Sequence, residues 1–412
     1  MSTLGQKRTL ADYSITSSPG RKKREWHGVG AAIGPSTRLA GHASFGTRSG
    51  RFACCVTVCK STIEIMPPGI MPATILRHAY GIYRSAAMLA GMQLDLFTPL
   101  KNGPMSVATL ANALSLRADK LRPLLYALVD AELLTLVEDD HFANTPEAEV
   151  YLVRGRDMYL GSAHELYSDL WAAALAAGQS IRAGRPKAKH DFTAMSDEEL
   201  GAFFRGLHAG ALATGRQLAT TYDFGPLRNL LDVGGGSGGV SIAACQNCRD
   251  LRATIIELPR VAPIAQDMVR EAQLADRVNV LATDIVERPP EGRFDVAVLR
   301  NLIQVLGVDA ARQALRNVGK VIDHGGWLFI VGHVLEDDRL APAEALYLNL
   351  AFLSLYDEGQ SYTEREHRMW LAEAGFTDID VRYSAAPGGG KHRYCAQGLG
   401  RKGKLPPIVV GL

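Results

Sequence analysis

The chain has 412 residues, of which 47% are hydrophobic and 21% charged, a composition typical of a folded protein with two or three domains. Its net charge of +2 is unevenly distributed: residues 1–65 carry ten basic and three acidic side chains, whereas the other residues carry 35 basic and 40 acidic ones. The body of the chain therefore lacks the basic footprint of a nucleic-acid-binding protein. No apolar run reaches the roughly 18 residues that a membrane span requires. We therefore expect the protein to bind neither nucleic acid nor a membrane.

Residues 1–65 are rich in Gly, Ser and Arg and show little periodicity, so they are not predicted to form a domain. The run Arg21-Lys-Lys-Arg24 leaves open a localisation or nucleic-acid-binding tail, and the acid-poor composition leaves open a transit peptide. We favour an unstructured extension. This includes the case of a start codon assigned too far upstream, since Met66 and Met71 both precede the first helical pattern.

The next part of the chain predicts a winged-helix arrangement. Residues 73–97 carry apolar side chains at helical spacing, Ser106 is a suitable N-cap for a helix over 107–114, and residues 120–134 have one strongly apolar face. The segment 134–145 then predicts a hairpin with an acidic tip. Acidic side chains also interrupt the helix that would contact DNA, which makes phosphate contact unfavourable: Asp119, Asp130 and Glu132.

A mainly helical segment with many aromatic side chains follows, and aromatic residues at helical spacing more often form core than a ligand site: Tyr159, Tyr167, Trp171, Phe192, Phe203 and Phe204. Strands then alternate with helices, which predicts a mostly parallel α/β sheet: 229–233, 253–257, 278–282, 294–299 and 326–334. A last antiparallel pair is expected at 378–384 and 392–398. The predicted divisions are a winged-helix-like domain over 72–145, a helical region over 146–225, an α/β domain over 226–398 and a flexible tail over 399–412.

The most informative stretch is the glycine-rich turn at 230–239, Leu-Leu-Asp-Val-Gly-Gly-Gly-Ser-Gly-Gly, between a predicted strand and helix. Glycines let the backbone approach a ligand closely because no Cβ intervenes. Taken literally, the glycines also satisfy the dinucleotide fingerprint G-x-G-x-x-G, so a nicotinamide cofactor must be weighed. Asp232 immediately before them would repel a pyrophosphate and attract an ammonium group, such as that of S-adenosylmethionine.

Acidic side chains accompany the following strands. Glu257 ends the second strand and can accept hydrogen bonds from ribose hydroxyls, which both cofactors offer. Asp284 follows the third strand and can accept from an adenine amino group, and Asp295 accompanies the fourth. We expect these acids to line the crevice at the carboxyl ends of the strands, where open α/β sheets bind ligands.

In these features the chain resembles the class I S-adenosylmethionine-dependent O-methyltransferases of the plant caffeate and bacterial polyketide type. The matching pieces follow one another in the family's order: Asp232-Val-Gly-Gly-Gly-Ser-Gly, Glu257-Leu-Pro259, Asp284-Ile285, Phe294-Asp-Val-Ala-Val-Leu-Arg300, Gly325-Gly-Trp-Leu-Phe-Ile-Val331 and Tyr362-Thr-Glu-Arg-Glu. The resemblance covers about residues 72–398. It implies a Rossmann-like seven-stranded sheet and an N-terminal winged-helix domain that forms a homodimer and helps to wall the partner's substrate pocket. It also implies that the region over 146–225 lines the acceptor site.

The resemblance assigns the cofactor contacts. Asp232 and the glycines at 234, 235, 236 and 238 correspond to the cradle for the methionine portion, and Glu257 with Leu258 to the ribose site. Asp284 and Ile285 correspond to the adenine site, one by hydrogen bonding and one by packing. Arg300 occupies the position of a family Lys that contacts the cofactor. No metal ion is expected.

The sequence departs from the family at the base that deprotonates the acceptor. Gln304 stands where the family has a His, and His333 and Ser361 stand where two Glu bracket that His. A glutamine amide cannot take up a proton near neutral pH. Three interpretations remain: His333 is a relocated base, the acceptor needs no strong base, or the protein binds S-adenosylmethionine without turnover.

Two cysteines at Cys245-Gln-Asn-Cys248 have redox or metal spacing but lack a second pair, so a structural role is favoured, and we expect the reducing cytoplasm. The sequence thus predicts a homodimeric S-adenosylmethionine-dependent methyltransferase acting on a small aromatic or polyketide-like molecule, with O-methylation as the family default. C- or N-methylation and a catalytically silent cofactor-binding or winged-helix regulatory protein are the alternatives.

Overall fold

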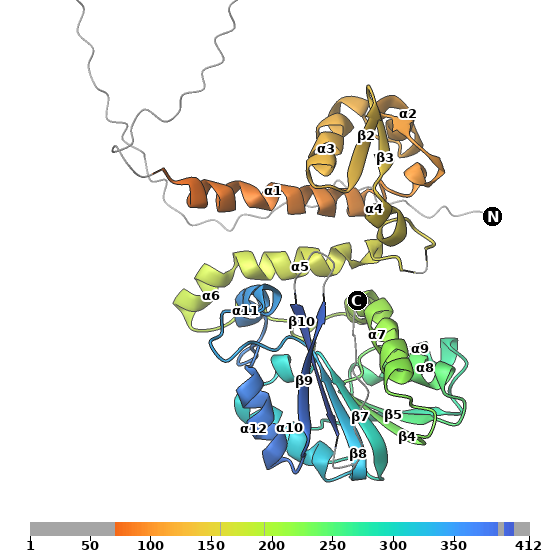
Figure 1. Ribbon diagram of the computed structural model, residues 1–412, viewed down its shortest axis with the longest axis vertical. Coiled ribbons are helices and arrows are strands. Elements are labelled where there is room, and N and C mark those ends of the chain that lie inside the picture. The colour runs from red at the N-terminus through yellow and green to blue at the C-terminus, as the bar shows by residue number, and fades with distance from the viewer. Residues whose placement is uncertain (1–70, 157, 193, 386–390, 399–412) are drawn as a thin grey trace, which may run out of the picture. The chain divides into compact units, whose positions relative to one another are not determined.

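The computed structural model describes residues 71–156, 158–192, 194–385 and 391–398, with side chains described up to residue 381 (Figure 1). The extension predicted over 1–65 and the tail predicted over 399–412 lie outside the described residues. Among the described residues, no helix is both long enough and apolar enough to cross a membrane.

The N-terminal part has the predicted winged-helix arrangement. It contains α1 (Ala73–Gln93), η1 (Pro99–Asn102), α2 (Val107–Ala113) and α3 (Ala118–Asp130), and a three-stranded sheet in the order β1-β3-β2: β1 (Met105–Ser106), β2 (Leu134–Glu138) and β3 (His141–Asn144). Ser106 caps α2 as predicted, because its Oγ accepts from the backbone N–H of Thr109 at 3.2 Å. The first helix ends earlier than residue 97, since Asp95 adopts a φ of 50° that an α-helix cannot continue through.

A series of helices leads to the α/β domain: α4 (Pro146–Tyr151), η2 (Gly161–Ala163), α5 (His164–Leu175), α6 (Ala177–Ala183) and α7 (Asp197–Thr221). Helix α7 begins with a capping box, in which Ser196 and Glu199 each bond the other's backbone N–H. It packs closely on α8 (Gly239–Asn247) through Gly215, where a Cβ would come within 2.5 Å of the Val240 carbonyl oxygen. This contact places α7 beside the glycine-rich turn.

The seven-stranded sheet is confirmed, in the order β6-β5-β4-β7-β8-β10-β9. Neighbouring strands from β6 to β8 are parallel, and β10 runs antiparallel to both of its neighbours, β8 and β9. The strands are β4 (Asn229–Val233), β5 (Arg252–Glu257), β6 (Val278–Ala282), β7 (Phe294–Arg300), β8 (Ile322–Val331), β9 (Ile379–Ala385) and β10 (Lys391–Gly398). The fifth strand begins four residues before the predicted 326. The glycines at 325 and 326 lie in a register shift between β7 and β8, with φ of 83° at Gly325, and not in a turn before the strand.

Helices cover both faces of this sheet (Figure 1). One face packs a hydrophobic cluster against α7, α8 and α9 (Ala262–Glu271), and the other packs a second cluster against α10 (Val308–Gly319) and α12 (Glu364–Glu373). Helix α11 (Ala343–Leu355) packs on α5 through a separate small cluster. The remaining short element, η3 (Ile303–Val305), follows β7 directly.

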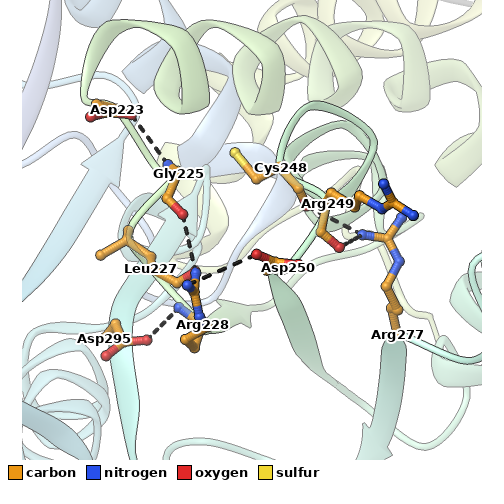
Figure 2. A network of polar contacts seen from close by, with 9 residues as sticks. All are labelled: Asp223, Gly225, Leu227, Arg228, Cys248, Arg249, Asp250, Arg277 and Asp295. Carbon is orange, nitrogen blue, oxygen red and sulfur yellow. Dashed lines mark hydrogen bonds and ion pairs between the residues drawn. The ribbon is translucent and has the colours of Figure 1, made fainter.

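The expectation that Asp295 lies at the ligand-binding edge is wrong. Asp295 is the second residue of β7, at the amino end of the strand. Its Oδ2 accepts from the backbone N–H group of Arg228 at 2.7 Å (Figure 2) and from that of Asn229 at 2.8 Å. It therefore ties β7 to the start of β4, at the edge opposite the glycine turn. The sequence showed that Asp295 accompanies the fourth strand, but it did not show at which end of that strand the residue lies.

The Cys-x-x-Cys pair has the environment of a structural element. Both thiols are free, and burial raises the pKa of Cys245 to about 11, which keeps it unreactive. The Arg277 guanidinium donates to the backbone carbonyl groups of Cys248 (3.2 Å) and Arg249 (2.9 Å) (Figure 2). It also donates to the carbonyl of Cys245 at 2.9 Å and so closes the end of α8. Within the described ranges, no group of His, Cys, Asp or Glu side chains has the arrangement of a metal site.

Candidate active site

A cavity of about 380 Å³ opens at the carboxyl ends of the parallel strands. Its lining includes eleven of the residues singled out from the sequence: Asp232, Gly234, Gly235, Gly236, Glu257, Leu258, Asp284, Ile285, Arg300, Gln304 and His333. Gly238 lies outside this lining. It is the N-cap of α8 with a φ of 73°, and a Cβ there would come 2.7 Å from Ile255 Cδ1, so it shapes the turn.

The glycine-rich turn forms one wall of the cavity. Gly234 and Gly236 have φ of 64° and 57°, and the backbone N–H of Gly234 donates to the Ile256 carbonyl at 2.9 Å. A Cβ at Gly235 would lie 2.8 Å from Ile255 Cγ2 and 3.0 Å from Asp232 Cγ. The turn therefore requires small residues, and it leaves its backbone open to a ligand.

Asp232 is the most unusual group in the site. It is fully buried, and its Oδ2 accepts from the hydroxyl (2.8 Å) and the backbone N–H (3.2 Å) of Ser241. Its Oδ1 is also buried and has no hydrogen-bond partner among the described residues. Burial raises the pKa of Asp232 to about 6, although the bonds from Ser241 and the charge of Arg300 act in the opposite direction. An ammonium group would supply the missing donor and the missing positive charge.

The other polar residues reach the same cavity from the carboxyl ends of three strands. Glu257 is buried, which raises its pKa, and its two oxygens accept from the backbone N–H groups of Gly236 and Leu258, each at 2.8 Å. A carboxylate oxygen keeps a second lone pair after one such bond, so Glu257 can also accept from hydroxyl groups. Asp284 Oδ1 accepts from the Val286 N–H at 2.8 Å, and the Arg300 Nε donates to the Thr214 hydroxyl of α7 at 3.1 Å.

Gln304 connects the segment that follows β7 with the segment that follows β8. Its amide Nε2 donates to Asn301 Oδ1, and its Oε1 accepts from the backbone N–H of His333, both at 3.3 Å. Gly332 makes room for this arrangement, since a Cβ there would come 2.5 Å from Gln304 Oε1. Ser361 is fully buried outside the cavity lining, where its hydroxyl donates to the Ala345 carbonyl of α11. Of the three positions at which the sequence predicts a departure from the family, two therefore reach the cavity.

Apolar and aromatic side chains also line the cavity. The predicted helical region supplies Phe192, Phe203 and Phe204, whereas Tyr159, Tyr167 and Trp171 lie outside the lining. Further members come from α5, α7 and α11, namely Leu166, Leu170, Leu207, Leu348, Phe352 and Tyr356. Sequence reasoning missed His190 in this wall, because a single histidine in a loop without periodicity carries no signal of its surroundings.

Comparisons with known proteins agree with this geometry. Residues 173–377 match the family described as the O-methyltransferase domain, and residues 76–154 match the O-methyltransferase dimerisation domain. The tetracenomycin polyketide synthesis 8-O-methyl transferase TcmO of Streptomyces glaucescens is 28% identical over 77% of this chain and 94% of its own length. The acetylserotonin O-methyltransferase of Mus musculus is 29% identical over 75% of this chain and 84% of its own.

Solved structures share the fold. A crystal structure of an O-methyltransferase-like protein from Nostoc punctiforme superposes with a TM-score of 0.69 at 20% identity, covering 80% of this chain and all of that one. Human N-acetylserotonin methyltransferase in complex with S-adenosylmethionine gives a TM-score of 0.66 at 21% identity, covering 81% of this chain and 99% of that one.

The fold and the acidic, glycine-lined cavity define an S-adenosylmethionine-dependent methyltransferase. The chain belongs to the O-methyltransferase family with an N-terminal dimerisation domain. The cofactor predicted from Asp232 and its neighbours is thus S-adenosylmethionine, while the contacts assigned to individual residues stay predictions.

Proposed function

We propose that the chain transfers the methyl group of S-adenosylmethionine to a hydroxyl group of a small aromatic, polyketide-like molecule. The observation that carries this proposal is one cavity that is lined by both acidic and aromatic side chains. The acidic groups suit a cationic nucleoside, and the aromatic groups suit a flat, apolar acceptor. Relatives named for comparable acceptors include TcmO and a 3-hydroxy-5-methyl-1-naphthoate 3-O-methyltransferase from Streptomyces sahachiroi, 28% identical over 78% of this chain.

Each of the cavity residues would contact a different part of the cofactor. Asp232 Oδ1 would accept from its ammonium group, Glu257 from the ribose hydroxyls, and Asp284 from the adenine amino group. Ile285 would pack on the adenine, Leu258 would lie beside the ribose, and the glycines at 234–236 would allow the backbone close to the methionine portion. Arg300 is held by Thr214 near Asp232 and would face the cofactor's carboxylate. When bound, S-adenosylmethionine supplies an activated methyl group, so the protein's main task is to align the acceptor with it.

A second candidate is N- or C-methylation. It is favoured by Gln304, whose amide cannot remove a proton from a neutral hydroxyl. A relative described as the N,N-dimethyltransferase OxyT of Streptomyces rimosus is 24% identical over 76% of this chain. His333 lines the cavity and is the base that the sequence nominates for O-methylation.

We also propose that the protein is a homodimer formed through its N-terminal domain. Large apolar side chains are exposed along α1, including Ile75 (70%), Tyr80 (66%) and Tyr83 (64%). A contiguous apolar surface of this kind typically marks a protein interface. The match of residues 76–154 to a dimerisation domain supports a second copy of the chain as its partner.

The test is incubation of the full chain with S-adenosylmethionine carrying a labelled methyl group and a panel of 1-naphthol, hydroxynaphthoates and aromatic amines. Label recovered on a phenolic oxygen supports the proposal. Label that is recovered only on a nitrogen or carbon atom favours the second candidate, N- or C-methylation. Cofactor binding without transfer to any member of the panel contradicts both and favours a silent binding protein.

A further inference from the structure

Among the aromatic side chains that line the cavity lies one histidine with a buried ring nitrogen that lacks a hydrogen-bond partner among the described residues. His190 lies in the loop between α6 and α7, and its side chain is only 6% exposed. Its Nε2 is 2.5 Å from Oδ2 of Asp169, which lies on α5. Its Nδ1 is buried and has no hydrogen-bond partner among the described residues. The backbone N–H of His190 donates to the Leu355 carbonyl at the end of α11 and fixes the loop there.

This arrangement fixes the chemistry of the ring. A carboxylate can only accept a hydrogen bond, so Asp169 selects the tautomer that carries its hydrogen on Nε2. Nδ1 then presents a lone pair in a water-poor, aromatic environment. A buried acceptor without a donor is unfavourable, and a hydroxyl group of a bound ligand would satisfy it. A nucleophile–base pair in which a third group orients the base is the usual arrangement for proton removal.

Three aromatic rings surround the His190 ring. Phe203 meets the His190 ring edge to face with centroids 5.2 Å apart, Phe192 lies at 6.1 Å, and Tyr356 lies at 6.3 Å. Aromatic walls at these distances favour a flat acceptor.

We propose that His190, oriented by Asp169, and not His333, binds the acceptor hydroxyl and removes its proton, in the role of the family histidine whose position Gln304 occupies. The inference rests on the proposed O-methyl transfer. The O–H bond of the acceptor breaks as its proton moves to Nδ1, and an oxygen lone pair forms the new O–CH₃ bond. The sulfur–methyl bond of the cofactor breaks with its electron pair remaining on sulfur, and the imidazolium later releases its proton to water.

The groups around His190 are compatible with this cycle. Asp169 is 42% exposed and, when ionised, stabilises the imidazolium that forms. Burial raises the pKa of Tyr356 to about 12, so this neighbour stays neutral. The adjacent charges of Lys189 and Asp357 form an ion pair with each other at 2.5 Å. Asp191 is the remaining charged neighbour along the chain.

The test compares His190→Gln and Asp169→Asn with His367→Gln. His367 is the control, because its side chain is also buried but lies on α12 and bonds the Thr363 carbonyl outside the large cavity. With weakly acidic 1-naphthol, His190→Gln should lower kcat by about 10²–10⁴-fold, the usual contribution of a positioned base. The loss should shrink for acceptors that are already ionised at the assay pH, and S-adenosylmethionine affinity should not change. Asp169→Asn should also lower kcat with 1-naphthol and leave S-adenosylmethionine affinity unchanged, because an amide can donate as well as accept and no longer selects the tautomer with its hydrogen on Nε2.

A second readout separates this inference from the proposed function. Nitrogen-15 NMR of the full chain with S-adenosylhomocysteine should find Nε2 protonated, and addition of 1-naphthol should shift the Nδ1 resonance of His190. Binding of 1-naphthol without any change at His190, or full turnover of 1-naphthol by His190→Gln, would overturn the inference. Failure of the wild-type protein to methylate any acceptor would overturn the proposed function, whereas the Nδ1 shift would still establish the acceptor contact.

Discussion

Replacement of Asp232 by Asn should stabilise the ligand-free protein and weaken cofactor binding, two effects of opposite sign from one change. The pKa of this carboxyl rises from an ordinary 3.8 to about 6, which corresponds to about 3 kcal/mol of free energy disfavouring the ionised form at pH 7. An amide has almost the same shape and no charge. It leaves its NH₂ group without an acceptor at the former Oδ1 position, which costs about 1–2 kcal/mol. The expected net gain in the free energy of unfolding is about 1–2 kcal/mol.

The pH dependence of the free energy of unfolding tests whether ionised Asp232 destabilises the folded protein. Because the folded-state pKa is raised, the penalty is complete above pH 6 and disappears as the pH falls towards 3.8. Denaturant unfolding at pH 7 should therefore separate wild type from Asp232→Asn, and unfolding near pH 4 should bring them close together. Calorimetry at pH 7 should show S-adenosylmethionine bound about 10–100-fold more weakly by the variant, because a hydrogen bond between charged groups is lost.

The matched control is Asp295→Asn on the same sheet. Asp295 accepts two backbone N–H groups at the opposite edge, so its replacement should lower stability and leave cofactor affinity unchanged. If Asp232→Asn were less stable than wild type at pH 7 and bound S-adenosylmethionine equally well, the reasoning about the unsatisfied carboxylate would be refuted.

Three further predictions concern the cofactor and the dimer. Wild-type affinity for S-adenosylmethionine should decline as the pH falls through about 6, since protonated Asp232 cannot hold an ammonium; a flat calorimetric profile from pH 7.5 to 5 would contradict this. Glu257→Ala should weaken S-adenosylmethionine binding by about tenfold or more by removing the proposed ribose acceptor, and unchanged affinity would remove Glu257 from the site. Tyr83→Asp should dissociate the dimer by placing a charge in its apolar contact, as measured by sedimentation; a variant that sediments as wild type would exclude this face of α1.

Much of the cofactor half of the site could be predicted from sequence because it is local. The apolar strand ending in Asp232, the glycines after it and the acids ending the next strands are each read within a few residues. Parallel strands bring their carboxyl ends to one edge, so three such local patterns predict one site. Asp295 shows the limit of this reasoning, because it lies at the amino end of β7 and therefore at the edge of the sheet opposite the cavity.

The acceptor half could not be predicted because it depends on tertiary packing. His190 and Asp169 are 21 residues apart, with α6 between them, and only the packing of α5 and α11 brings them together. Neither residue sits in a periodic or glycine-marked pattern. Likewise, the sequence indicated that Gln304 replaces a base, but its position between Asn301 and His333 appears only in three dimensions.

The most direct test of the central claim is calorimetric titration of the full-length protein with S-adenosylmethionine and, separately, with S-adenosylhomocysteine. The account predicts saturable binding of both, with one cofactor per chain and a dissociation constant on the order of micromolar. Absence of binding by the folded protein would contradict the assignment of the acidic, glycine-lined cavity as the cofactor site.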